Sequence, residues 1–413
     1  MRPARRPGAH SARGGVRWPM RESPTFAFGL FRGSLGHPVF TKLYLENWKN
    51  FTRVDVPLRR RAFIVGPNAS GKSNLLDAIR FLRDVAEPQG GLQRAIAARR
   101  SISHVRSLHA RRYPAIVVEV EVQIGSDAWT YRLALTQDNN RVPRVETEVV
   151  RKNGLLVRER PDAEDKSDPS RLTQTHLEQV NANKDFRAVA EFLADVRYLH
   201  LVPQLIREPD RSVGRHRDPY GGDFLEQVFS IPIKTRDSRL RRITEALRVA
   251  VPQLKELETV RDGRGVPHLR GLYEHWRPNA GWQTEEQFSD GTLRLLGLLW
   301  VLLDGAAPVL LEEPELSLHT AVIRYLPQIL TRLGRKGGRQ VILTTHSADL
   351  LNDQGIAPEE VLVLIPTAEG TVVDLASTKR EIRELLRAGM SIAEAVLPRT
   401  APPNAAQLTL FGE

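Results

Sequence analysis

The sequence predicts an α/β fold with a mixed central sheet, flanking helices and an antiparallel β lobe, split by a mainly helical insert. Three observations lead to this prediction. An apolar strand at 61–66 enters a glycine-rich turn and is followed by an amphipathic helix at 72–85. A second apolar stretch at 308–315 ends in several acidic residues. Between 116 and 150, apolar and polar residues alternate in three segments, as in an antiparallel meander.

Composition excludes several classes of protein. The chain has 413 residues, of which 41% are hydrophobic and 26% charged, as in ordinary globular proteins. It has no cysteine, which excludes disulfides, thiolate metal sites and a cysteine nucleophile. The longest apolar run, Leu295–Leu303, has nine residues, whereas a membrane helix needs about 20. We therefore expect no membrane contact and a cytoplasmic location.

Positive charge is concentrated at the start of the chain. The whole chain carries +11, and residues 1–40 contribute seven arginines and one acid. We expect 1–40 to be a disordered basic arm. Such an arm can hold nucleic acid or act as a targeting segment. The interpretation we favour is that the native start lies later, near Val39, where the first recognisable strand begins.

The remaining sequence changes character several times. A polar, proline-flanked segment at 161–170 is expected to be a solvated loop. The predicted parts are the first part of a globular head at 41–160, a mainly helical insert at 161–282, the second part of the head at 283–378, a terminal helix at 379–397 and a flexible tail at 398–413.

The glycine-rich turn at 66–73 matches G-x-x-x-x-G-K-[ST] and lies between a strand and a helix, as this phosphate-binding motif requires. Its backbone N–H groups and the positive end of the helix suit phosphates. Lys72 would contact the β- and γ-phosphates, and the Ser73 hydroxyl would bind Mg²⁺. A chance glycine turn is disfavoured by this context. The candidate ATP-binding residues are Gly66, Pro67, Asn68, Ala69, Ser70, Gly71, Lys72, Ser73 and Asn74.

The apolar stretch at 308–311 ends in paired carboxylates. In phosphate-loop NTPases a carboxylate at this place holds Mg²⁺, so Ser73 and Glu312 are the candidate metal ligands. Glu313 would then face an attacking water and act as general base. The alternative is a strand that runs into an acidic helix cap. ATP and Mg²⁺ are the substrate and cofactor that these motifs predict.

Two further motifs complete the candidate site. His346 follows the apolar strand 340–345, where a polar side chain can reach the γ-phosphate. This placement favours a functional histidine over a structural one. Ser289, Asp290, Gly291 and Thr292 precede the apolar helix at 293–303. They could form a plain helix cap or a second anion-binding helix start. Ser289 lies 24 residues before Glu313, the spacing of an ABC-type signature.

The segments GPNASGKSN, FSDGTLRLLGLL, LLEEPELSLH and TTHSADLL together resemble AAA domain-containing, ABC-type ATPases of the OLD, RecF and SMC kind, including ATP-binding proteins of bacterial phage defence. The resemblance covers 41–137 and 283–375 well, and the middle only through 198–207. It implies a P-loop NTPase head of ABC-ATPase type. It also implies a homodimer that encloses two ATP molecules, with the signature of each chain contacting the ATP of the other.

Some residues depart from the pattern of these families. Glu312 stands where many ABC ATPases have Asp, and the signature has Ser-Asp-Gly instead of Ser-Gly-Gly. Gln93 is a weak candidate for the Q-loop glutamine. Ser73 and Ser289 are 216 residues apart, too close for the long coiled coils of SMC proteins and too far for a transporter domain. No Asp-x-Asp follows His346, so any nuclease is expected to be a separate chain.

DNA is the expected macromolecular partner, through phosphate contacts without base specificity. The alternative is solvated surface. The candidate residues are Arg99, Arg100, Arg106, Arg111 and Arg112, with His104 and His109, and in the insert Arg236, Arg239, Arg241, Arg242 and Arg248. The terminal segment Gln407–Phe411 also resembles the peptide by which bacterial proteins dock on the sliding clamp.

We therefore predict an ATPase that acts as an ATP-driven dimeric switch in DNA-related phage defence or DNA repair. One alternative is a RecF-like mediator of recombination repair. Another is a regulatory scaffold that controls a separately encoded nuclease or toxin.

Overall fold

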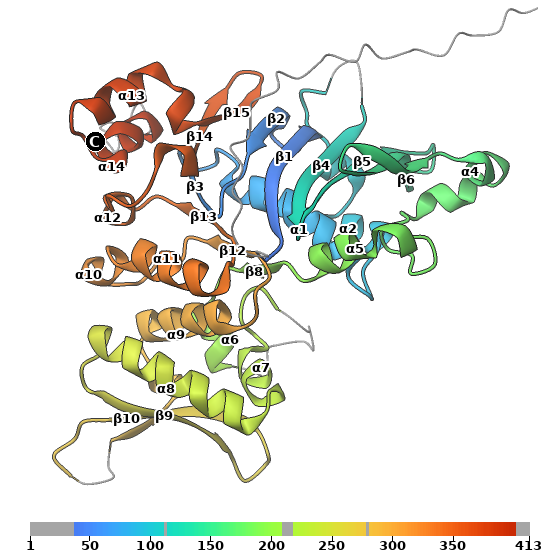
Figure 1. Cartoon of the computed structure of the whole chain (residues 1–413). Helices are drawn as coiled ribbons and strands as arrows, with labels where there is room; N and C mark the ends of the chain where they lie inside the picture. Colours follow the sequence, from blue (N-terminus) through green and yellow to red (C-terminus); the bar gives the residue numbers. More distant parts are fainter. Residues whose placement is uncertain (1–36, 111–113, 209–217, 278–280, 402–413) are drawn as a thin grey trace, which may run out of the picture. The chain divides into compact units, whose positions relative to one another are not determined.

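A computed structural model describes residues 37–110, 114–208, 218–277 and 281–401, and all the statements below concern these residues. The basic arm predicted at 1–40 lies almost wholly outside them, as do Arg111, Arg112 and the segment Gln407–Phe411. The described chain forms three sheets, and Figure 1 shows helices packed beside each of them. The predicted α/β class is confirmed.

The first sheet is antiparallel and has the order β2-β1-β4-β5-β6-β7. Each strand pairs with its neighbours in antiparallel register, so the predicted hairpin and meander are confirmed. Apolar side chains alternate along most of these strands and turn one face of the sheet toward the core, whereas β7 at the edge has exposed leucines. The strands are β1 (Val39–Trp48), β2 (Phe51–Pro57), β4 (Ile116–Ile124), β5 (Asp127–Gln137), β6 (Pro143–Lys152) and β7 (Leu155–Arg160).

The second sheet is mixed and has the order β15-β14-β3-β13-β12-β8. Its strands are β3 (Arg61–Val65), β8 (Arg197–Leu199), β12 (Val309–Glu312), β13 (Val341–Thr345), β14 (Val361–Thr367) and β15 (Gly370–Leu375). All pairs are parallel except β14 with β15. Because the carboxyl ends of parallel strands lie at one edge, the polar residues that follow β3, β12 and β13 are brought together there.

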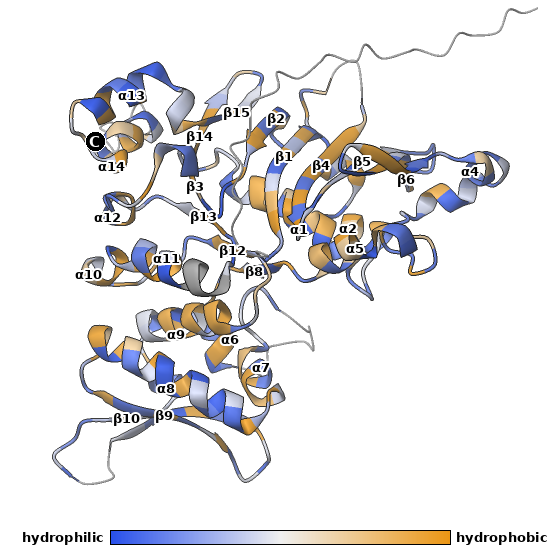
Figure 2. Ribbon diagram, in the orientation of Figure 1, coloured by the Kyte–Doolittle hydropathy of each residue, from blue (hydrophilic) through white to orange (hydrophobic). Residues whose placement is uncertain are grey.

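Both faces of this mixed sheet are buried. Ala62 and Ile64 belong to a cluster with the first sheet and α1 (Lys72–Ala86), whereas Phe63 and Val65 belong to a second cluster with α9 (Asp290–Leu303). Burial on both sides explains why these strands are continuously apolar in sequence. Figure 2 shows α9 as hydrophobic over most of its length, while α8 (Ile233–Ala250) is strongly hydrophilic on one side.

A third sheet lies in the range predicted to be mainly helical. It has the order β11-β10-β9 and packs against α8. Leu254 and Leu257 of β9 are both buried and three residues apart, a spacing that looks helical in sequence. The strands are β9 (Leu254–Arg261), β10 (Pro267–Tyr273) and β11 (Trp282–Thr284). β11 has only three residues, which is too few for an alternating pattern to reveal it.

Two other local predictions differ from the structure. The segment 161–170 is mostly exposed, as expected of a solvated loop, but it contains the short helix α4 (Ala163–Ser167), and its Asp165 pairs with Arg160 at 2.7 Å in the interior. The helix predicted at 379–397 is two helices, α13 (Arg380–Arg387) and α14 (Ile392–Val396), because the intervening Gly389 has a left-handed φ of 93°.

The remaining helices are short connectors around these sheets. They are α2 (Leu92–Ala97), α3 (Ile102–Val105), α5 (Arg187–Ala194), α6 (Pro203–Arg207), α7 (Phe224–Ser230), α10 (Thr320–Ile323), α11 (Leu326–Gly337) and α12 (Ala348–Leu351).

Candidate functional site: an ATP site of ABC type

The glycine-rich loop connects β3 to α1, as predicted. Gly71 caps the helix with a left-handed φ of 97°, and a side chain on it would collide with the amide of Asn50. The first turn of α1 has no acidic residue, so its positive end is not neutralised from within the helix. The loop geometry therefore suits an anion, as the motif at 66–74 predicts.

Lys72 is buried inside this loop, with 7% of its surface exposed. Its Nζ donates to the carbonyl oxygens of Gly66 at 3.1 Å and Pro67 at 3.0 Å, and no described carboxylate lies within ion-pair distance. Burial lowers its pKa, while the nearby Glu313 and other acids oppose that shift. A buried ammonium without a carboxylate partner is costly, and phosphate oxygens would supply the missing negative charge.

Ser73 and Glu312 meet across the sheet edge. The Ser73 hydroxyl donates to Glu312 Oε1, and the Tyr198 hydroxyl donates to Glu312 Oε2. His200 Nδ1 lies 4.0 Å from the same Oε2. Hydroxyl and carboxylate oxygens are the ligands that Mg²⁺ prefers, so Ser73 and Glu312 fit this metal.

Glu313 adopts a left-handed φ of 44° directly after β12. Its backbone N–H donates to the Thr344 hydroxyl at 3.1 Å, which fixes it to the neighbouring strand β13. His346 Nε2 lies 3.4 Å from Glu313 Oε1, close enough to interact electrostatically, but it makes no hydrogen bond. Burial, reinforced by Lys72, lowers the pKa of His346. The two predicted catalytic residues are thus neighbours.

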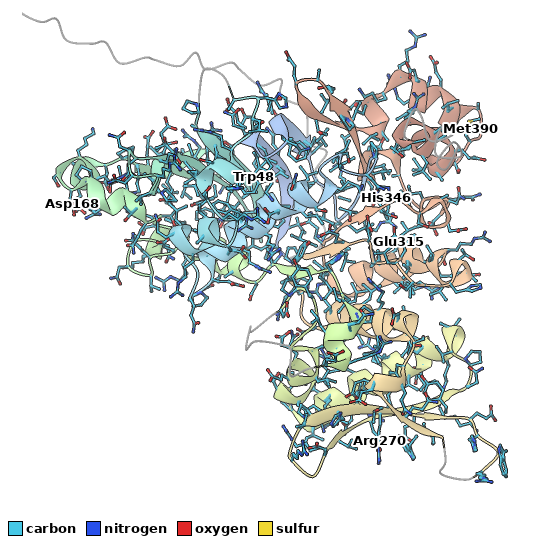
Figure 3. The ribbon with its side chains drawn as sticks, turned by 180° about the vertical axis from the view of Figure 1, so that it is seen from behind. Trp48, Asp168, Arg270, Glu315, His346 and Met390 are labelled. Carbon is cyan, nitrogen blue, oxygen red and sulfur yellow. The ribbon has the colours of Figure 1, made fainter. Side chains whose placement is uncertain are left out.

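Glu315 is a buried carboxyl that the sequence reasoning did not single out. Its Oε1 accepts from the Thr345 hydroxyl at 2.5 Å and from the His346 N–H at 3.2 Å. Figure 3 labels both Glu315 and His346, which lie close together. Burial raises the pKa of Glu315. Glu315 thereby connects the loop after β12 to the backbone of His346.

The predicted signature caps α9. Ser289 Oγ accepts from the Thr292 N–H at 3.2 Å, and Arg207 Nη2 donates to Asp290 at 2.6 Å. A Cβ on Gly291 would lie 2.5 Å from the Ser317 carbonyl oxygen, so only glycine permits this close approach. The signature therefore packs on the loop that follows Glu313. Among the described residues, no hydrogen bond or ion pair joins 289–292 to the glycine-rich loop.

Asn50, in the turn between β1 and β2, holds the glycine-rich loop from outside. Its Nδ2 donates to the Ser70 carbonyl and to the Thr371 hydroxyl, both at 2.8 Å, and its Oδ1 accepts from Asn74 at 2.8 Å. Trp48 Nε1 also donates to the Asn74 carbonyl at 2.9 Å. Sequence reasoning missed Asn50 because an asparagine in a short turn is explained by turn geometry alone.

Tyr198 and Arg207 were also missed as site residues. Both lie in 198–207, the only part of the predicted insert at 161–282 that resembles the ATPase families. This resemblance was the one feature of the sequence that could have identified them. Gln93, the weak Q-loop candidate, donates through Nε2 to the carbonyl oxygens of Pro143 and Thr173, so its amide supports the β lobe instead.

The basic residues proposed for DNA contact fall into two groups. Arg99 is enclosed in ion pairs with Asp77 at 2.7 Å and Asp84 at 2.9 Å, so its assignment to DNA was wrong. Arg239 likewise pairs with Asp304 at 3.0 Å. Exposed positions among the described candidates are Arg100, His104, His109, Arg241, Arg242 and Arg248.

The fold and these motifs define an ABC-type P-loop ATPase. The family AAA_21, described as "AAA domain, putative AbiEii toxin, Type IV TA system", matches residues 61–352. This match spans more than half of the chain, and the chain therefore belongs to this family. No curated protein matches the chain.

Solved structures of SMC head domains are similar in fold. The SmcHead bound to the C-winged helix domain of ScpA has 14% identity and a TM-score of 0.51, over 81% of this chain and 96% of the other. A Smc head with an extended coiled coil from Pyrococcus furiosus has 15% identity and a TM-score of 0.47, over 85% and 100%. The SMC head from Thermotoga maritima has 15% and 0.43, over 81% and 98%. The first of these supports the ABC-type head fold.

A search for membrane spans among the described residues finds no helix of sufficient length and apolarity.

Proposed function

We propose that this chain binds ATP with Mg²⁺ and hydrolyses it to ADP and phosphate. The observation that carries the proposal is the convergence of three groups at one sheet edge. They are the ammonium of Lys72, which has no carboxylate partner among the described residues, the Ser73–Glu312 pair and the Glu313–His346 pair. These groups supply a phosphate cradle, oxygen ligands for a metal and a candidate base.

Each group has a definite task in this proposal. Lys72 neutralises phosphate oxygens as the bond from the γ-phosphorus to ADP breaks. Ser73 and Glu312 hold Mg²⁺, which when bound would withdraw charge from the phosphates. Glu313 takes a proton from the water that attacks the γ-phosphorus. His346, kept mainly neutral near pH 7 by its lowered pKa, donates a hydrogen bond to the γ-phosphate.

Dimerisation through ATP is part of the same proposal. Ser289–Thr292 form a second phosphate-binding helix start that has no described bond to the glycine-rich loop of its own chain. A second copy, placed head to head, would bring this signature to the ATP of its partner. Loss of ATP would then release the dimer, which is the behaviour of a switch.

The switch is proposed to act on DNA in phage defence or DNA repair. Arg241 and Arg242 are exposed on α8 and are available for phosphate contacts. The alternative of a scaffold that controls a separately encoded toxin is supported by the description of the family, which names a toxin of a toxin–antitoxin system. A separate nuclease and the sliding clamp remain proposed partners on sequence grounds.

Phosphate release by the purified chain, with and without duplex DNA, tests the proposal. We expect Mg²⁺-dependent release that Lys72→Ala reduces at least about 10²-fold, because the ammonium contacts the transferred phosphate. Lys379→Ala is the matched control, since Lys379 pairs with Asp374 on the surface. Release that persists in Lys72→Ala would contradict the site, and release unaffected by DNA would favour the toxin alternative.

A further inference from the structure

The metal-binding carboxylate proposed here is a glutamate, and its length creates a positioning problem. Glutamate has one more methylene than aspartate and therefore one more torsion to fix, which costs conformational entropy. Glu312 is the last residue of β12, and Ser73 on α1 contacts only its Oε1. A single hydrogen bond leaves the carboxylate free to rotate about its bond to Ser73, so a second contact is needed to hold the group.

Tyr198 supplies that second contact. Strand β8 pairs in parallel with β12, with Tyr198 opposite Leu310 and Leu199 opposite Leu311. The Tyr198 hydroxyl reaches forward along the sheet and donates to Oε2, the oxygen that Ser73 leaves free. The two carboxylate oxygens are thus held from two different elements.

The tyrosine is itself held in place by α1. The guanidinium of Arg80 lies over its ring, 4.9 Å from the centroid. Arg80 follows Ser73 by seven residues, two helical turns, so both side chains extend from the same face of α1. One helix therefore positions Glu312 twice, directly through Ser73 and indirectly through Arg80 and Tyr198.

We propose that Tyr198 is a positioning residue that fixes the orientation of the Glu312 carboxylate for the metal. The proposal rests on the proposed ATP and Mg²⁺ site. The hydrogen bond occupies Oε2 and turns Oε1 toward Ser73, so that both metal ligands face the same point. In this proposal Tyr198 acts through Glu312.

Mn²⁺ binding measured by electron paramagnetic resonance, with a non-hydrolysable ATP analogue present, reads the metal site without turnover. In Tyr198→Phe the ring under Arg80 remains and only the hydroxyl is lost, so the fold should persist, which circular dichroism would check. We expect the half-saturating Mn²⁺ concentration to rise about 10-fold, in the range for loss of a hydrogen bond that orients a metal ligand. Metal-free nucleotide binding should be unchanged.

Tyr44→Phe is the matched control, because the Tyr44 hydroxyl donates to Glu46 at 3.1 Å on β1, away from the metal ligands. It should leave Mn²⁺ binding as in the wild type. Glu312→Asp provides a second background: the shorter side chain cannot reach Tyr198, so adding Tyr198→Phe should change Mn²⁺ binding no further. A merely structural tyrosine would give the same loss in both backgrounds.

The outcomes distinguish the role of Tyr198 from the proposed ATPase function. If the wild type binds Mn²⁺ with nucleotide but Tyr198→Phe does not weaken it, or weakens it equally in the Glu312→Asp background, the role of Tyr198 is overturned and the proposed function stands. If the wild type shows no nucleotide-dependent Mn²⁺ binding, both are overturned.

Discussion

Three parts of the candidate site are held by hydrogen bonds from residues outside its motifs. Asn50 supports the glycine-rich loop, Tyr198 contacts Glu312 and Glu315 contacts the backbone of His346. Hydrogen bonds of this kind restrict groups that must act at defined positions. They therefore lower the conformational entropy that is lost when a ligand binds. The supports therefore belong to the site as much as the motifs do.

Asn50→Ala tests such a support. The change removes the Nδ2 donations to Ser70 and Thr371 and the hydrogen bond that Oδ1 accepts from Asn74, so two contacts with the glycine-rich loop are lost. At about 1 kcal/mol for a net hydrogen bond, we expect ATP affinity to fall roughly 5- to 30-fold, as measured by calorimetry. Asn153→Ala, in the turn between β6 and β7, is the control. Unchanged affinity in Asn50→Ala would show that the loop holds its shape unaided.

At the scale of elements, the antiparallel lobe is fastened to the segment after β7 by a buried polar cluster. Glu148 is fully buried and accepts from the Tyr131 hydroxyl at 2.9 Å and from the His176 N–H at 2.7 Å. Arg160 donates to both Glu148 and Asp165 in the same interior. Removing one member would leave a buried charge without its partner, so the cluster fixes 161–178 to the lobe.

His176 makes the stability of this element depend on pH. Burial, together with Arg160 and Arg158, lowers its pKa to about 4, against the smaller opposing effects of Asp165 and Asp162. The unfolded chain, with a histidine pKa near 6.5, binds the proton first as pH falls. The free energy of unfolding should therefore decrease as the pH falls from about 6.5 to about 4. Below about pH 4 the histidine is protonated in both states and should contribute no further change.

Chemical denaturation at a series of pH values measures this slope. His176→Gln removes the titrating group and should flatten the slope between about pH 6.5 and 4, whatever its effect on absolute stability. His104→Gln, at an exposed position on α3, should keep the slope of the wild type. Equal slopes in all three proteins would show that His176 does not cause the pH dependence of stability.

At the scale of the whole molecule, sequence predicted the strands that carry motifs and the alternating strands of the first sheet, but it missed the third sheet, β9 to β11. The glycine-rich loop and the acidic strand end identify β3 and β12 because their chemistry requires strands there. Leu254 and Leu257 did not reveal β9, since their three-residue spacing is typical of a helix. Arg99 looked like surface charge because its partners, Asp77 and Asp84, lie on another helix and their pairing depends on packing.

Prediction from sequence is limited in the same way at the candidate site. Lys72, Ser73 and Glu313 could be named from local patterns. Tyr198 reaches the site only through the register of β8 with β12, and Asn50 only because the turn between β1 and β2 packs on the glycine-rich loop. Register is set by burial over the whole sheet, so it cannot be predicted from a short sequence motif. The proposed mechanism depends most on one of these residues, Glu313, as the base that activates water.

Single-turnover hydrolysis of ATP by Glu313→Gln tests this claim most directly. The amide is nearly the same size as the carboxylate but cannot accept the proton of the attacking water. We predict ATP binding close to that of the wild type and hydrolysis slower by about 10²–10⁴-fold. Hydrolysis at nearly the wild-type rate, with ATP bound equally well, would contradict the claim and the mechanism built on it.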